Sequence, residues 1–331
     1  VAKSAVAAQS AVSMGYERPS VRKKVFRKNR KALGPATAGS LCLTKIEAKE
    51  FAFQYNLDSS LPADWVAEFE TIMNNLGAVV PVSERIHSVP DVKMPFQIFA
   101  WNSAVPNPFP QIPGAGGASI SGNDFLGKHM ILEIPESEFT NNSLHRYSVI
   151  AHEYFHIYQI ALSEDIMQPT WITEGGAKVV EELYTQQYYG QSEFDGGLFP
   201  VSATVLSNPA AFEKYERDGG LVGSPADINY NSSAFMVLAL IDMLEGRAIP
   251  EACAFELVLK DFVAERPDHV DWRDAFQSVF AMSVEDFYSA LRDGPYPSTG
   301  ATDDWYQGAA IDVGAVLPSK SLTLNEIFAA T

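Results

Sequence analysis

The chain has 331 residues, which suits one large domain or two domains of ordinary size. Hydrophobic residues make up 47% of it and charged residues 20%, and this balance excludes wholesale disorder. The sequence contains no apolar run near the length of about 18 residues that a membrane-spanning helix needs. Its two cysteines, Cys42 and Cys253, are too few for a disulfide scaffold or a cysteine-built metal site. Their pairing and the compartment stay open, with a secreted or periplasmic location slightly favoured.

The net charge of −17 is unevenly distributed along the chain. Residues 1–35 contain nine Lys and Arg against one acid, whereas the remainder contains 15 basic and 40 acidic side chains. We predict a basic N-terminal arm or pro-segment over residues 1–35, attracted to an acidic body. Because an acidic body repels phosphate, no nucleic-acid partner is expected outside the arm. Within the arm, the basic stretch 22–31 leaves a nucleic-acid or membrane patch as an alternative.

Aromatic and β-branched residues predict strands in the first 140 residues, at 40–45, 96–101, 118–121 and 129–134. A helix is expected from Pro62 to about Asn75, and the Pro- and Gly-rich segment 102–117 is expected to be a loop. From Ser143 onward the pattern becomes helical, with stops at Gly190, Gly219-Gly220, Gly246 and Gly294-Pro295.

Strands followed by helices indicate an α+β fold of two packed halves. We expect a sheet-containing subdomain over residues 36–140 and a helical subdomain over residues 141–295. Residues 296–331 form a C-terminal tail for which the sequence predicts no element.

The helix expected from Ser143 to Leu162 contains His152-Glu153-Tyr154-Phe155-His156, an H-E-x-x-H motif. Residues four apart lie one turn above each other, so both imidazoles project from one face and can reach one zinc ion at about 2.0–2.1 Å. Glu153 lies about 100° around the helix, where its carboxylate can take a proton from a zinc-bound water. Polar residues share the face of the histidines, so we expect a half-buried helix whose histidines face a cleft.

A third protein ligand is expected from a neighbouring element, because catalytic zinc usually keeps three protein ligands and one water. Glu174 is the candidate, since it stands at the start of a second helix opened by Pro169-Thr170. The alternative is an ordinary acid in the first turn of a helix, favoured there by the helix dipole. With His152 and His156, Glu174 predicts one zinc ion per chain.

The H-E-x-x-H motif followed by Trp171-Ile172-Thr173-Glu174-Gly175-Gly176-Ala177 resembles the gluzincin group of zinc metallopeptidases, which includes thermolysin-like and aminopeptidase-type enzymes. The resemblance covers roughly residues 95–293. It implies a zincin-like fold, in which a twisted, mostly antiparallel sheet packs on a helical subdomain with the zinc cleft between them. It also implies that the segment beginning Gly116, Gly117, Ala118 is an edge strand flanking the cleft, and that Tyr230 is a catalytic tyrosine at the start of a long apolar helix.

The sequence also departs from these relatives. The aminopeptidases carry an acid on the edge strand, and residues 114–120 contain none, which slightly favours an endopeptidase. Where the thermolysin pattern has an aspartate four residues after the ligand glutamate, this chain has Lys178. Glu181 fits the aminopeptidase-like spacing and is expected to contact a metal ligand, with an exposed helix charge as the alternative. His145 lies about 10 Å along the helix from His152, too far for ligation.

We therefore expect a zinc-dependent peptidase that hydrolyses peptide bonds with metal-activated water and Glu153 as general base. Its edge strand would pair with an extended peptide or protein substrate. One alternative is a zinc hydrolase that acts on a non-peptide amide or ester. Another is a catalytically silent zincin-fold binding protein, against which the intact Glu153 argues, because holding zinc requires no glutamate at that position.

Overall fold

The structure is a computed structural model that describes residues 52–164, 168–196, 201–214, 230–294, 296, 298–302, 309–311 and 313–328. The basic arm over 1–35, the strand expected at 40–45 and the glycine pair at 219–220 lie outside these residues. None of the helices within them is both long and apolar enough to cross a membrane. Cys253 is disulfide-bonded, and Cys42, the only other cysteine in the sequence, lies outside the described residues.

The first half of the described chain contains a four-stranded sheet with the order β1-β2-β4-β3. Its strands are β1 (Phe53–Leu57), β2 (Phe96–Asn102), β3 (Ala118–Asn123) and β4 (Gly127–Ile134). The β1–β2 and β2–β4 pairs are parallel and only the β3–β4 pair is antiparallel, so the expectation of a mostly antiparallel sheet is wrong. The parallel pairs arise because long connections separate their strands in the chain: α1 (Ala63–Val79) lies between β1 and β2, and the loop 103–117 with β3 lies between β2 and β4. The sequence pattern did not reveal β1.

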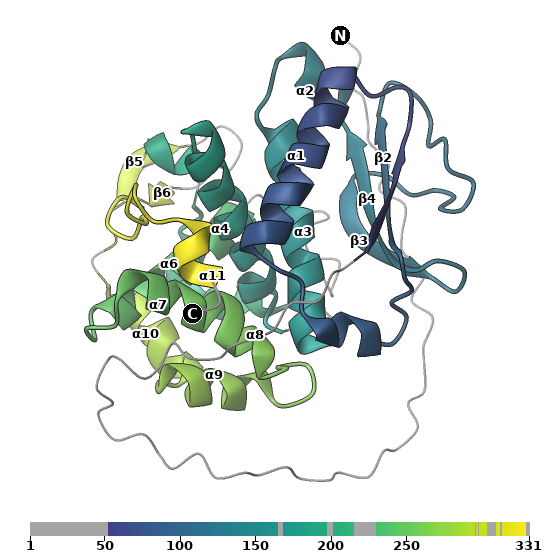
Figure 1. Cartoon of the computed structure of the whole chain (residues 1–331). Coiled ribbons are helices and arrows are strands. Elements are labelled where there is room, and N and C mark those ends of the chain that lie inside the picture. The colour runs from purple at the N-terminus through teal and green to yellow at the C-terminus, as the bar shows by residue number, and fades with distance from the viewer. Residues whose placement is uncertain are drawn as a thin grey trace. The chain divides into compact units, whose positions relative to one another are not determined.

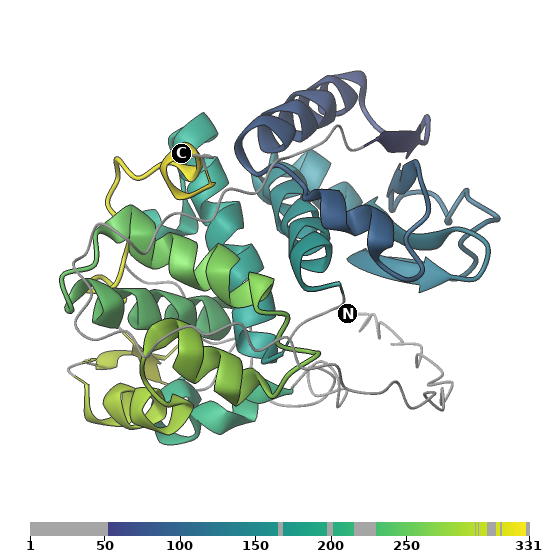
Figure 2. The ribbon, with the colours of Figure 1, turned by 60° about the horizontal axis from the view of Figure 1, so that its bottom comes forward.

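Both faces of the sheet are covered, and this explains why β4 is almost continuously buried. On one face, Met130 and Leu132 join the main hydrophobic core together with residues of α1 and α3 (His145–Ser163). On the other face, Ile131 packs in a separate cluster with Ile112 from the Pro- and Gly-rich loop. Figures 1 and 2 show α1 and α3 beside the sheet and the remaining helices beyond them.

From His145 onward the described residues are mainly helical, as the sequence predicts. Its three long helices are α3, α4 (Thr170–Tyr189) and α6 (Tyr230–Glu245). The helix α4 ends at Gly190, whose left-handed φ of 64° suits glycine, and α6 ends just before Gly246, so both predicted stops are confirmed. The α+β class is confirmed as well.

Shorter elements complete the described chain. They are η1 (Glu84–Ser88), α2 (Glu136–Thr140), η2 (Glu193–Gly196), α5 (Thr204–Ser207), η3 (Pro209–Glu213), α7 (Glu251–Glu256), the π-helical turn η4 (Leu257–Asp261), α8 (Phe262–Ala264), α9 (Trp272–Phe280), α10 (Val284–Asp293), the paired strands β5 (Ser298–Thr302) and β6 (Ala309–Ile311), and α11 (Leu324–Phe328). The C-terminal α11 packs on the core, since the ring of Phe328 contacts Phe155 and Tyr158 of α3.

The helix α3 is more deeply buried than its polar stripe suggests. Its residues from Ser148 to Ser163 are buried apart from His156, which is intermediate, so the expectation of a half-buried helix is wrong. The polar stripe faces α4, where hydrogen bonds satisfy it. For example, Gln159 Nε2 donates to the carbonyl oxygen of Thr173 at 3.0 Å.

Candidate metal centre

Two neighbouring helices bring the predicted ligands together. His152 and His156 project from one face of α3, one helical turn apart, and Glu174 stands in the second turn of α4. The Nε2 atoms of His152 and His156 lie 3.5 and 3.3 Å from the same oxygen, Oε2 of Glu174. One ligand atom from each of the three residues lies within 4.8 Å of the other two, so the group could hold a metal ion.

The other ring nitrogen of each histidine has its own acceptor. His152 Nδ1 lies 3.2 Å from Glu181 Oε2, and His156 Nδ1 lies 2.8 Å from Gln159 Oε1. Because a carboxylate or amide oxygen accepts a hydrogen bond, both Nδ1 atoms donate, and Nε2 of each ring is the nitrogen that a metal ion at the centre could take as its ligand in place of a proton. Glu181 is thus buried against a histidine rather than exposed on its helix.

Gln159 was not singled out as a site residue from the sequence. The signal that would have found it is its spacing, since it follows His156 by three residues and therefore lies on the same face of α3. Its amide connects the two helices, because Oε1 faces His156 while Nε2 bonds to α4.

The electrostatics of the centre favour a positive charge between the three side chains. Burial disfavours the imidazolium of His152, but its contacts with Glu174 and Glu181 outweigh burial and raise its pKa to about 10. Burial likewise opposes ionisation of Glu174, yet the two histidines hold the pKa of its carboxyl well below the usual range. The anionic surroundings that stabilise a proton on His152 would equally stabilise a metal cation in its place.

Glu153 lies beside the His152, His156 and Glu174 group but is not one of its three candidate ligands. Its side chain is buried, and its oxygen Oε2 has no hydrogen-bond partner in the structure. Burial is the main cause that raises the pKa of its carboxyl, and the nearby histidines oppose the rise. A carboxylate oxygen left free in this way can accept a proton from a molecule that enters the site.

A cavity of about 130 Å³ opens over the centre. Its lining comprises Ala118, Ser119, Ile120, His152, Glu153, His156, Gln159, Ile160, Thr173, Glu174 and Tyr230. The ring of Tyr230 lies perpendicular to that of His152, with 5.7 Å between the ring centroids. Tyr230 is 39% exposed, so its side chain is open to solvent at the rim.

The predicted edge-strand segment reaches the cavity only in part. Ala118 is the first residue of β3 and lines the cavity, whereas Gly116 and Gly117 precede the strand. Gly117 adopts a φ of 70°, and its N–H donates to Glu133 Oε2 at 2.8 Å. A Cβ on Gly116 would lie 2.9 Å from the same carboxylate oxygen, so these glycines let the chain bend around Glu133.

Two other titratable side chains, His145 of α3 and Tyr189 of α4, do not line the cavity. His145 Nδ1 lies 2.8 Å from Glu138 Oε1, and this hydrogen bond is the main cause that raises the pKa of His145. The Tyr189 hydroxyl donates to Glu68 on α1 at 2.5 Å. Neither side chain is placed to act at the centre.

No protein-family model, no curated protein and no solved structure matches this chain. The site itself combines a His-His-Glu group, a free buried carboxylate and a cavity bordered by a sheet edge. Such a combination can hold a cation and move a proton next to it.

Proposed function

We propose that this chain is a zinc-dependent peptidase with a zincin-like fold, similar to the gluzincin group. The observation that carries the proposal is the distance of the two histidine Nε2 atoms from Glu174 Oε2. In a tetrahedral site with bonds of about 2.0–2.1 Å, any two ligand atoms lie about 3.3–3.4 Å apart. The two separations of 3.5 and 3.3 Å agree with this geometry. Two imidazoles and one carboxylate are also a ligand set that suits catalytic zinc.

When bound, zinc supplies a Lewis acid that acidifies water and polarises a carbonyl group. Glu153 would accept a proton from the attacking water at its free Oε2 and later deliver it to the leaving nitrogen. The raised pKa of Glu153 suits this exchange, because a group that acts first as a base and then as an acid works best when its pKa lies near the operating pH. Tyr230 at the cavity rim would donate a hydrogen bond from its hydroxyl group to the oxygen on which negative charge develops.

The sheet edge beside the cavity supports a peptide as the substrate. β3 is the last strand in the sheet order, and Ala118, Ser119 and Ile120 belong to both the strand and the cavity lining. An extended peptide can add to such an edge through backbone hydrogen bonds, which recognise any sequence. The absence of an acid in residues 114–120 slightly favours an endopeptidase, since no carboxylate there would bind a free amino group.

Metal analysis of the purified full chain tests the centre. We expect one zinc ion per chain, and His156→Ala should lose most of it. His145→Ala is the matched control, because His145 lies on the same helix and pairs with Glu138 outside the cavity. A His156→Ala protein that keeps stoichiometric zinc would refute the ligand assignment.

Digestion of a broad peptide library tests the reaction. Zinc-dependent cleavage that disappears in Glu153→Gln supports a peptidase. Zinc binding without peptide cleavage would leave the two alternatives, a hydrolase of other amides or esters and a silent binding protein. Activity on small ester or amide substrates separates those two.

A further inference from the structure

A buried lysine lies next to the proposed metal centre, and the chemistry above does not use it. Lys178 stands one helical turn after Glu174 on α4, and its side chain is only 8% exposed. Its ammonium nitrogen lies 2.7 Å from Glu182 Oε1 and 3.1 Å from both Glu181 Oε1 and Glu193 Oε2. One cation therefore faces three carboxylates, two of which are almost fully buried.

Glu181 connects this lysine to the centre. Its Oε1 accepts hydrogen bonds from Lys178 Nζ and from Ser148 Oγ, the latter at 2.7 Å. Its Oε2 faces His152 Nδ1 at 3.2 Å. With Oε1 fixed by two donors, the carboxylate plane has one orientation left, and in that orientation Oε2 points at the histidine.

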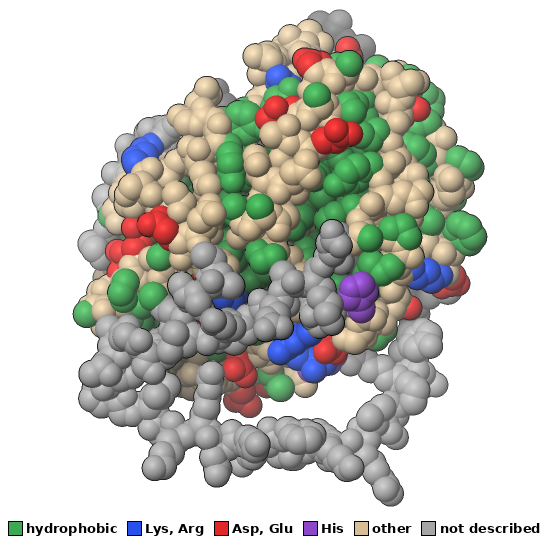
Figure 3. Space-filling view, viewed as in Figure 1, with side chains coloured by type: hydrophobic (Ala, Val, Ile, Leu, Met, Phe, Trp, Pro, Cys, Tyr) green, Lys and Arg blue, Asp and Glu red, His purple; other side chains and the backbone are tan. Residues whose placement is uncertain are grey.

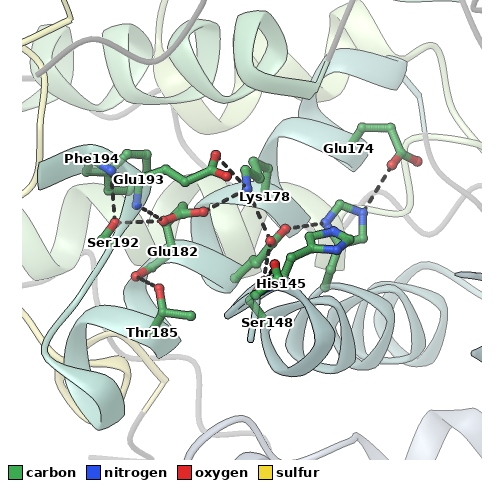
Figure 4. Close-up of polar contacts among 12 residues, drawn as sticks. His145, Ser148, Glu174, Lys178, Glu182, Thr185, Ser192, Glu193 and Phe194 are labelled. Carbon is green, nitrogen blue, oxygen red and sulfur yellow. Dashed lines mark hydrogen bonds and ion pairs between the residues drawn. The ribbon is translucent and has the colours of Figure 1, made fainter. Parts of the chain in front are cut away.

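Glu182 keeps the lysine in place from the other side. Its Oε2 accepts from Ser192 Oγ at 2.7 Å and from the backbone N–H of Glu193 at 2.6 Å, so Oε1 is turned toward Lys178. Figure 4 shows the resulting chain of contacts, with Glu174 at one end, Lys178 between Glu182 and the centre, and Phe194 at the other end. The loop after α4 thereby fixes the position of the ammonium group.

We propose that Lys178 is a positioning residue of the metal centre, whose ammonium group holds the Glu181 carboxylate aimed at His152. The physical reason is the buried, charge-assisted hydrogen bond that Lys178 Nζ donates to Glu181 Oε1, which helps to fix where this carboxylate lies. Without that bond the Glu181 carboxylate can turn away, and its Oε2 would no longer accept the hydrogen bond from His152 Nδ1. The ring would then lose the orientation that directs Nε2 at a metal.

This inference rests on the proposed metal site, and it gives a role to a residue that departs from the thermolysin-like pattern. At the position of an aspartate in that pattern, this chain has a cation that acts through a glutamate three residues further along.

The test compares two buried lysine–glutamate pairs. In Lys178→Met/Glu182→Gln the ammonium is removed together with one carboxylate, so the net charge of the cluster is unchanged. Lys260→Met/Glu256→Gln is the matched control, because Lys260 Nζ lies 2.6 Å from Glu256 Oε1 in an equally buried pair with the same spacing of four residues. Neither control residue lines the cavity. Zinc affinity is measured for each full-length protein by competition with a chromophoric chelator, and the visible spectrum is recorded with Co²⁺ in place of zinc.

We expect the Lys178 variant to bind zinc about 10–100-fold more weakly than the wild type, with a shifted Co²⁺ spectrum, because contacts that orient a ligand typically contribute this much. The Lys260 variant should lose thermal stability to a similar degree but keep wild-type zinc affinity and an unchanged spectrum. If the role of Lys178 is purely structural, both variants should lose thermal stability and both should keep wild-type zinc affinity.

Wild-type affinity in a folded Lys178→Met/Glu182→Gln protein overturns the inference and leaves the peptidase proposal intact. A wild-type chain that binds no zinc overturns both. If circular dichroism shows that the double variant does not fold, Lys178→Gln replaces it, with Lys260→Gln as its control. That single variant keeps an N–H donor without the charge, and zinc affinity equal to the wild type would again refute the role of the charge.

Discussion

Glu153 and Glu174 lie in the same small site, yet their surroundings push their pKa values in opposite directions. Burial without a hydrogen-bond partner on Oε2 raises the pKa of Glu153, whereas the two histidines lower that of Glu174 in spite of its burial. Two carboxyl groups separated in this way suit two different roles, one exchanging protons and the other staying ionised as a ligand.

The first prediction concerns Glu153→Gln. The amide keeps the size of the side chain and one oxygen, but it cannot accept a proton at neutral pH. Turnover should therefore fall by about 10²–10⁴-fold while zinc content stays at the wild-type level. Steady-state kinetics and metal analysis on the same sample check both halves. Turnover within a few-fold of the wild type would show that another group is the base.

The second prediction concerns the hydroxyl of Tyr230. Tyr230→Phe removes one oxygen from the cavity rim and keeps the ring that contacts His152. If the hydroxyl stabilises the developing oxyanion, kcat should fall by about 10²–10³-fold with little change in KM or zinc content. Tyr188→Phe is the matched control, since Tyr188 has a similar exposure of 38% but does not line the cavity. A loss of less than about threefold would assign the donor elsewhere.

At the scale of elements, the site depends on how closely α4 approaches α3 and α6. Gly176 faces Phe155 and Gln159 of α3, and a Cβ there would meet them at 3.5 Å. Gly175 faces the backbone of α6, where a Cβ would lie 2.3 Å from the carbonyl oxygen of Ser233. The residue next to the proposed ligand Glu174 thus determines how near α6, which begins at Tyr230, can come.

The third prediction follows from this contact. Gly175→Ala cannot be accommodated without moving α6, because its methyl group would meet backbone rather than a flexible side chain. We expect a loss of about 1–3 kcal/mol or more in the free energy of unfolding. Gly77→Ala in α1 is the control, since nothing lies within 4 Å of its Cβ and alanine should stabilise that helix by about 0.5–1 kcal/mol. Chemical denaturation of both variants measures the difference, and equal stabilities would contradict the close approach.

The sequence predicted those elements whose signals are local. The ends of α4 and α6 follow from glycines, and the H-E-x-x-H spacing puts two imidazoles on one face whatever surrounds the helix. It did not predict β1, whose burial is only partial and whose pattern is irregular, and it did not predict that β2 and β4 pair in parallel. The contacts of Glu181, Gln159 and Lys178 depend on how α3 and α4 face each other. The spacing of residues along one helix carries no information about that arrangement.

At the scale of the whole molecule, a bound metal would join two helices that face different parts of the fold. α3 packs against the sheet, α1 and α4, and α4 also packs against α6. The three proposed ligands are divided between α3 and α4, so metal binding would strengthen the existing contact between the helix that covers the sheet and the helices beyond it. On the face in Figure 3, Asp and Glu side chains are scattered rather than gathered in one patch.

The fourth prediction is that metal removal destabilises the whole fold. A ligand present at about 100 times its Kd stabilises the folded state by about 2.7 kcal/mol. For a chain of this size, chelation should lower Tm by about 4 °C, and added zinc should restore it. Differential scanning calorimetry with and without a chelator measures the shift. The Tm of the His156→Ala protein should not change on chelation. A wild-type Tm that is also unchanged by chelation would argue against zinc at this site.

The open edge of the sheet at β3 has a consequence for the self-association of the protein. The described residues place no strand beyond β3, and its sequence, Ala-Ser-Ile-Ser-Gly-Asn, has neither the charges nor the proline that usually protect an exposed edge. Backbone groups left available for a substrate are equally available to a strand from another molecule. Self-association should therefore grow with protein concentration, and an extended peptide occupying the edge should disperse it.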